Sequence, residues 1–133
     1  MAEQVLLVIS TFPDAETADR VAHTLIAGRF AACANIIPAI HSIYRWKDKI
    51  ETAGEVIAFF KITQDRQAAF QKKLCSLHPY EVPEIIFVPV VTGLPDYLPC
   101  VAESSSSYVQ RAFFSRLIRK LPRRSHLRLQ SRQ

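Results

Sequence analysis

Apolar residues follow two kinds of pattern in this chain, and the two patterns alternate along the sequence. Continuous apolar runs at 5–9 and 85–91 are typical of buried strands. Two other segments repeat apolar residues every three to four positions, which predicts helices with one apolar face. The helical positions are Ala18, Val21, Ala22, Leu25 and Ile26 in the first segment, and Ala69 or Phe70, Lys73 or Leu74, and Leu77 in the second.

The ends of both helices are marked by residues with suitable backbone or capping chemistry. Asp14 is expected to cap the first helix, although Thr17 three residues later completes only half of a capping box. Gly28 suits the end of that helix, because glycine is common at helix C-termini. Asp65 is expected to cap the second helix.

The segments 31–45 and 50–63 are expected to form a hairpin. The first segment is rich in small and β-branched residues, and the second has an apolar middle at 56–60. The residues between them, 46–49, are typical of a turn. Pro38 cannot donate a hydrogen bond to a neighbouring strand, so it predicts a bulge or a sheet edge.

This hairpin is too long to fit flat on a small domain. Two arms of about 14 residues, at roughly 3.3 Å per residue, would extend about 45 Å, whereas such a domain is about 30 Å across. The arms must therefore either bend at bulges or extend beyond the body. An overhanging hairpin would expose Tyr44, Trp46 and Ile50 near its tip, and we infer that these residues contact other copies in an oligomer. A ligand platform is the less favoured alternative for Trp46.

The expected order of elements is β, α, β, β, α, β, which is the ferredoxin-like arrangement. We therefore predict an α+β fold in which one antiparallel sheet carries both helices on one face. After the last strand, 92–96 is typical of a turn, and 97–101 is expected to form a short closing segment.

The charge of the chain divides it into two parts. Residues 1–103 contain nine basic and twelve acidic residues, a net charge of −3, and are predicted to form one domain. Residues 104–133 contain eight basic residues and no acidic one. After a serine-rich linker, their apolar residues predict a basic amphipathic helix up to Pro122 and then a disordered basic tail. This extension suits an anionic membrane surface, nucleic acid or the acidic body. Docking on the body, or disorder, is favoured over nucleic acid.

Several classes of protein are disfavoured by the sequence. No apolar run approaches the roughly 18 residues of a membrane span, and the first residues do not resemble a signal peptide. The three cysteines are widely spaced, without zinc-site spacing, which favours a cytoplasmic protein with reduced thiols. The sequence contains no phosphate loop, His-Glu-x-x-His motif or nucleophile elbow, so we do not expect an enzyme.

The segment His78-Pro79-Tyr80-Glu81-Val82-Pro83-Glu84 concentrates the polar chemistry of the chain. An imidazole, a phenol and two carboxylates lie within seven residues, and two prolines stiffen the backbone between them. Such a rigid loop is suited to ligand binding. A simple connection between helix and strand is the alternative, and the residue types alone favour it.

Taken together, several motifs resemble the CutA family of divalent-cation tolerance proteins over roughly residues 5–103. The motifs are Arg29-Phe30-Ala31-Ala32-Cys33-Ala34-Asn35, Ser42-Ile43-Tyr44-Arg45-Trp46, Glu55 with Lys61, and the segment 78–84. The resemblance implies a cytoplasmic homotrimer with hairpins paired between subunits, linked to tolerance of copper or another divalent metal. It also implies a similarity to PII signalling proteins, which bind small ligands between subunits.

The resemblance makes His78 the best candidate for a metal ligand. Some relatives have a cysteine and a second histidine where this chain has Ser10 and Leu77, so His78 would need help from Cys33, Glu81 or Glu84. From the residues alone, a packed and inert thiol is favoured for Cys33. The chain also departs from the family at Asp48, in place of a turn glycine, and at Cys100, in place of a tryptophan.

Three functions follow as hypotheses. The first is binding of, or response to, divalent metal ions, with copper favoured. The second is a PII-like module that binds a small anionic ligand between subunits near Lys61, Tyr80 and Glu84; an ion pair is an equally favoured role for Lys61. The third is a trimeric scaffold whose basic extension recruits an acidic partner.

Overall fold

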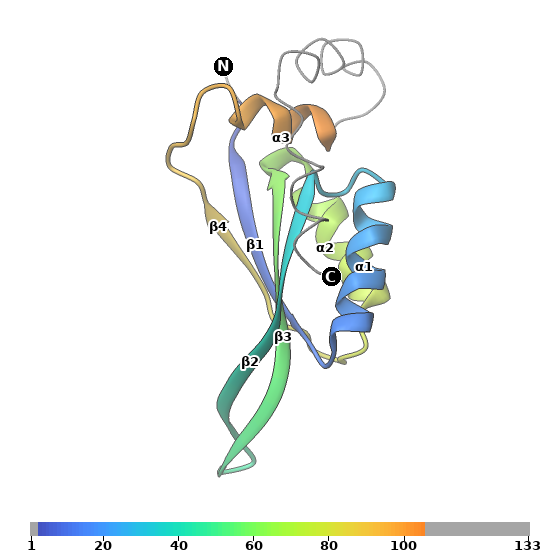
Figure 1. Ribbon diagram of the computed structural model, residues 1–133, viewed down its shortest axis with the longest axis vertical. Coiled ribbons are helices and arrows are strands. Elements are labelled where there is room, and N and C mark those ends of the chain that lie inside the picture. The colour runs from blue at the N-terminus through green and yellow to red at the C-terminus, as the bar shows by residue number, and fades with distance from the viewer. Residues whose placement is uncertain (1–2, 106–133) are drawn as a thin grey trace, which may run out of the picture.

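The computed structural model describes residues 3–105, which form a four-stranded antiparallel sheet with two helices on one face (Figure 1). The strands lie in the order β2-β3-β1-β4, which confirms the predicted α+β, ferredoxin-like fold. The elements are β1 (Val5–Phe12), α1 (Ala15–Ala27), β2 (Cys33–Trp46), β3 (Lys49–Thr63), the 3₁₀ turn η1 (Gln64–Arg66), α2 (Gln67–Leu77), β4 (Ile85–Pro89) and α3 (Leu98–Ser104).

The core lies between the sheet and the two long helices. Alternate residues of each central strand face the helices, because successive side chains of a strand point to opposite faces. The buried residues of the core are Leu6, Val8 and Phe12 of β1, Val56, Ala58, Phe60 and Ile62 of β3, Ala18, Val21, Ala22 and Leu25 of α1, Ala31 before β2, and Phe70 and Leu74 of α2. Among residues 3–105, α1 and α2 leave the opposite face of the sheet uncovered, and the short helix α3 packs against β3 and β1 at one end of the sheet (Figure 1).

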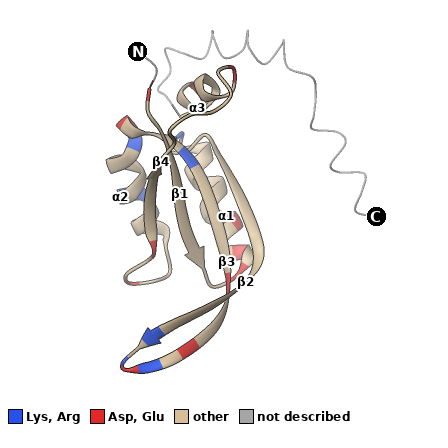
Figure 2. Cartoon of the chain, turned by 90° about the vertical axis from the view of Figure 1, so that its left-hand side faces the viewer, with Lys and Arg blue, Asp and Glu red and all other residues tan. Residues whose placement is uncertain are grey.

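The β2–β3 hairpin extends beyond the body, which is one of the two outcomes that its length allows (Figure 1). β1 ends at Phe12, opposite Val56, so the part of β3 before Val56 pairs only with β2. All residues from 43 to 52 are exposed. The predicted irregularity at Pro38 is also present, because the register of the two strands shifts between Ile37 and Ile40. Figure 2 shows charged residues of both signs at the hairpin tip.

The predicted first helix is confirmed at both ends. The Asp14 carboxylate accepts a hydrogen bond from the Thr17 backbone N–H at 2.7 Å, and Gly28 is the residue at the C-cap.

Two predictions about the later elements are wrong. Asp65 does not cap α2, because the η1 turn intervenes and its carboxylate accepts a hydrogen bond from the Thr63 hydroxyl instead. The last strand ends at Pro89, two residues earlier than predicted. The segment expected at 97–101 belongs to a third helix, α3, with Pro99 in its first turn, where proline is tolerated. The predicted amphipathic helix up to Pro122 and the tail at 123–133 lie outside the described residues.

Candidate functional site

His78 lies directly after α2 and is held in the protein by both ring nitrogens. Nε2 lies 2.8 Å from the backbone carbonyl of Thr11, and the backbone N–H of Tyr80 donates to Nδ1 at 3.1 Å. A carbonyl can only accept, and an N–H can only donate, so this pair of contacts requires a neutral ring with its proton on Nε2. The imidazole also stacks on the ring of Phe12, with 4.5 Å between ring centroids.

The surroundings of His78 favour its neutral form. The side chain is buried, and this burial lowers the pKa of His78 more than the hydrogen bond to Thr11 and the charge of Glu55 raise it. Protonation of Nδ1 would also remove the acceptor that the Tyr80 N–H uses. The histidine therefore connects the end of α2 to the end of β1 and fixes the start of the 78–84 loop.

Tyr80 connects the same loop to the base of the hairpin. Its hydroxyl donates to Oε2 of Glu55, on β3, at 2.9 Å. Burial raises the pKa of Tyr80 to about 12, and the hydrogen bond and charge of Glu55, with smaller effects from Tyr44 and Asp14, act in the same direction. We call Glu55, His78 and Tyr80 the hairpin-base site. The bond between Glu55 and Tyr80 was not predicted, because 25 positions separate the two residues.

The hairpin-base site does not fit a preformed metal site. Both nitrogens of His78 are already engaged, and Glu81 and Glu84 are exposed on the loop. Cys33 pairs with Lys61 near the other end of the sheet, away from Thr11. Across residues 3–105, no group of three or more His, Cys, Asp and Glu side chains is placed to hold a metal ion.

The ligand cleft predicted near Lys61, Tyr80 and Glu84 would lie between subunits, and within one protomer Lys61 and Tyr80 lie apart. Tyr80 contacts Glu55, which lies six residues before Lys61 on β3, or about 20 Å along an extended strand. Lys61 instead contacts Oδ1 of Asn35 at 3.0 Å and Sγ of Cys33 at 3.7 Å. The residues expected to share one cleft are therefore found at two separate places on the protomer.

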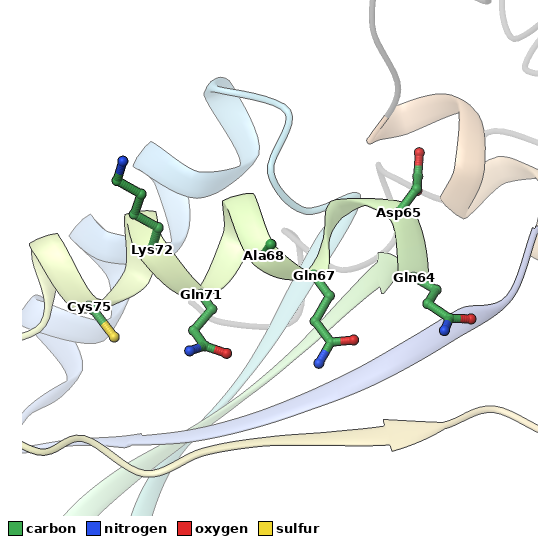
Figure 3. Close-up of a pocket in the computed structure, with 7 residues that line it drawn as sticks. All are labelled: Gln64, Asp65, Gln67, Ala68, Gln71, Lys72 and Cys75. Carbon is green, nitrogen blue, oxygen red and sulfur yellow. The ribbon is translucent and has the colours of Figure 1, made fainter.

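An open pocket of about 490 Å³ lies along η1 and α2, away from both places (Figure 3). One side of this helical stretch lines it, with Gln64, Asp65, Gln67, Ala68, Gln71, Lys72 and Cys75. In Figure 3 the side chains of Gln64, Gln67, Gln71 and Cys75 point toward the strands, whereas Asp65 and Lys72 point away from them. The charged groups therefore do not converge on one point, and the pocket indicates no particular chemistry.

Comparison with known proteins identifies one family. The model of the family described as "CutA1 divalent ion tolerance protein" matches residues 6–104. Protein CutA of Mus musculus is 41% identical over 97 residues, and the match covers 73% of this chain but only 55% of the mouse protein. The divalent-cation tolerance protein CutA of Thermus thermophilus is 36% identical over 103 residues, which cover 77% of this chain and 98% of that protein.

Solved structures agree with the sequence comparison. The crystal structure of CutA from Xylella fastidiosa has a TM-score of 0.75 at 39% identity, and covers 77% of this chain and 98% of its own. CutA1 from Oryza sativa has a TM-score of 0.77 at 31% identity, with coverage of 80% and 98%.

Proposed function

Because the chain belongs to the CutA1 divalent ion tolerance family, we propose that it acts in tolerance to divalent cations, as a cytoplasmic binding or response protein and not as an enzyme. The observation that carries this proposal is the extent of the match. The family model spans residues 6–104, which is nearly all of the part that the structure describes, and the Thermus relative is matched over almost its whole length.

We propose copper as the first ion to test, because imidazole and thiol ligands favour it. The geometry argues against a preformed site at His78, since a metal could bind there only after the ring left Thr11 and Tyr80. This arrangement is consistent with two kinds of response to metal. Either a second protomer supplies further ligands, or the metal does not contact His78 directly.

We further propose that the working form is a homotrimer. The support is the overhanging hairpin, where the side chains of Ile43, Trp46 and Ile50 are 60–71% exposed. Burying a large apolar side chain contributes about 1.5–3 kcal/mol, so covering these residues with neighbouring copies would stabilise an assembly. The predicted interface residues Tyr44, Trp46 and Ile50 all lie on this exposed part of the hairpin.

The role in tolerance is tested by expressing the full chain in bacteria that lack their own CutA and measuring growth in rising copper and zinc. We expect growth at metal concentrations that stop cells carrying the empty vector. Growth no better than that of the vector control would contradict the proposed role.

The place of His78 is tested separately by calorimetric titration of the intact oligomer with copper and with zinc. The geometry leads us to expect that His78→Ala weakens binding by less than tenfold, which is about 1.4 kcal/mol. His78→Gln is the matched control, because a glutamine side chain keeps one donor and one acceptor for Thr11 and Tyr80. A loss of tenfold or more in both variants would identify the imidazole as a metal ligand.

A further inference from the structure

A second group of reactive side chains lies far from the hairpin-base site, near the end of the sheet where α3 packs. It consists of Cys33 and Asn35 on β2, Lys61 on β3 and Tyr97 just before α3, and we call it the thiol cluster. Cys33 and Lys61 are directly opposite each other in the antiparallel ladder, so the backbone itself places the thiol beside the ammonium group.

Two groups that can donate hydrogen bonds lie beside the sulfur of Cys33. Nζ of Lys61 lies 3.7 Å from Sγ, and the Tyr97 hydroxyl lies 3.9 Å from it. Asn35 accepts a hydrogen bond from the same Nζ at 3.0 Å, which holds the ammonium group in place beside the sulfur. The Lys61 Nζ also lies 5.9 Å from the centre of the Tyr97 ring, so the cation, the phenol and the thiol form one compact group.

This arrangement complements negative charge on the sulfur. Burial raises the pKa of Tyr97, and the neighbouring Cys33 raises it further, by more than Lys61 lowers it, so the phenol keeps its proton and remains able to donate. The ammonium group supplies a full positive charge at the same sulfur. Thiolates beside a lysine are typical of reactive cysteines, since the thiolate and not the thiol is the nucleophile. Cys33 is also only partly buried in the protomer.

The other two cysteines have different surroundings. The Cys100 thiol donates to the backbone carbonyl of Asp96 at 3.4 Å, and burial raises the pKa of Cys100, with the carboxylates of Glu103 and Asp96 adding to the effect. Both features favour the unreactive thiol. Cys75 is exposed on α2, where reagents can reach it, but its sulfur is not part of a comparable group of converging donors among residues 3–105.

We propose that Cys33 is a modification site that reacts with small anionic disulfides to form a mixed disulfide. In this step the Cys33 thiolate attacks one sulfur of the reagent and a new S–S bond forms. The original S–S bond breaks, and its electron pair leaves with the second sulfur, which takes up a proton as a free thiol. Cys33 is oxidised and the released thiol is the reduced product. Lys61 favours an anionic reagent, because its charge remains beside the incoming group.

The test treats the full-length protein with glutathione disulfide at neutral pH and follows each cysteine by peptide mass spectrometry over time. We expect Cys33 to gain the glutathione adduct first. In Lys61→Met, the rate at Cys33 should fall about fivefold or more, and in Tyr97→Phe by a smaller factor. Cystamine is a cationic disulfide. Its rate of reaction with Cys33 should therefore differ less between the wild type and Lys61→Met than the rate with glutathione disulfide does.

Cys75 is an internal control in every sample, because its rate should be the same in the wild type and in Lys61→Met. Circular dichroism and oligomer mass establish that each variant is folded and assembled. The proposal is wrong if Cys33 stays unmodified while Cys75 reacts, or if Cys33 reacts at the same rate after Lys61→Met in a folded protein. These outcomes do not depend on metal tolerance, so they test the thiol cluster independently.

Discussion

At the scale of single residues, His78 makes the stability of the protein depend on pH. In the folded protein the pKa of His78 is lowered from its usual value of 6.5. As the pH falls below about 6.5, the His78 ring therefore binds a proton more readily in the unfolded chain than in the folded protein. This contribution is absent above pH 6.5 and destabilises the fold as the pH falls toward the folded pKa. We expect denaturant unfolding to show lower stability at about pH 5 than at about pH 7.5.

The variant His78→Gln separates this effect from the titration of carboxylates. It removes the ionisable ring but leaves a side chain able to bond both Thr11 and Tyr80. Its stability should therefore fall less between the same two pH values than that of the wild type. Equal losses in the two proteins would show that His78 does not titrate differently on folding.

Ser10 carries a polar group that the described part of the structure leaves without a partner. Its side chain is completely buried, and across residues 3–105 its hydroxyl makes no hydrogen bond. Leaving a buried hydroxyl unpaired costs about 1–3 kcal/mol, so Ser10→Ala should raise the free energy of unfolding by about 1 kcal/mol. Ser105→Ala is the control, because that buried hydroxyl donates to Val101 at 2.6 Å and its loss should bring no gain. A lower stability for Ser10→Ala would refute this assignment.

Residue-level predictions succeeded where both partners are close in the sequence. The cap at Asp14 could be predicted because its partner, Thr17, is three residues away. The bond between Tyr80 and Glu55 could not, since only the folded chain brings the loop to the base of the hairpin. The same applies to Tyr97, which reaches the sulfur of Cys33 across 64 positions.

At the scale of elements, the hairpin turn contains two residues in the left-handed region. Lys47 has a φ of 48° and Asp48 a φ of 62°, and the flanking Trp46 and Lys49 are paired. Two-residue hairpin turns of this kind favour glycine, because other residues pay about 1 kcal/mol for a positive φ. Asp48→Gly should therefore strengthen the hairpin by up to about 1 kcal/mol, measured as slower hydrogen exchange of its backbone amides.

Glu51→Gly provides the opposite control. This residue lies in β3, outside the turn, where a glycine only adds freedom to the unfolded chain. In this variant the backbone amides of the hairpin should exchange faster, and the change in rate should correspond to a similar free energy of opposite sign. If both glycine variants speed up exchange, the strained turn is not a weak point of the hairpin.

The bulge in β2 shows why element order is easier to predict than register. Trp46 pairs with Lys49, so an unbroken hairpin would place Cys33 opposite Ile62, a core residue. The shift between Ile37 and Ile40 places it opposite Lys61 instead. Pro38 indicated an irregularity but not its size, and one residue decides which face a side chain occupies. The thiol cluster could therefore not be predicted from the sequence.

At the scale of the whole molecule, many of the large apolar residues left exposed lie on strands of the sheet, and the others lie on loops and on α1. Ile43, Trp46 and Ile50 lie on the overhanging hairpin, and Ile86 and Val88 lie on β4. The hairpin would be an unstable two-stranded ribbon if it stayed isolated in water. The length of the hairpin and its exposed side chains both indicate contacts with further copies. The length could be predicted from the sequence, whereas the exposure is known only from the structure.

The last prediction compares two exposed apolar residues with different positions. Ile50, on the hairpin, is 71% exposed in the protomer, and Val91, on the loop after β4, is 96% exposed. If copies cover the hairpin, Ile50→Lys buries a charge in the interface, which is strongly unfavourable, whereas Val91→Lys leaves a charge in water. Analytical ultracentrifugation should show a trimer for the wild type and Val91→Lys, and dissociation for Ile50→Lys. A trimer of unchanged stability in Ile50→Lys would place the interface elsewhere on the molecule.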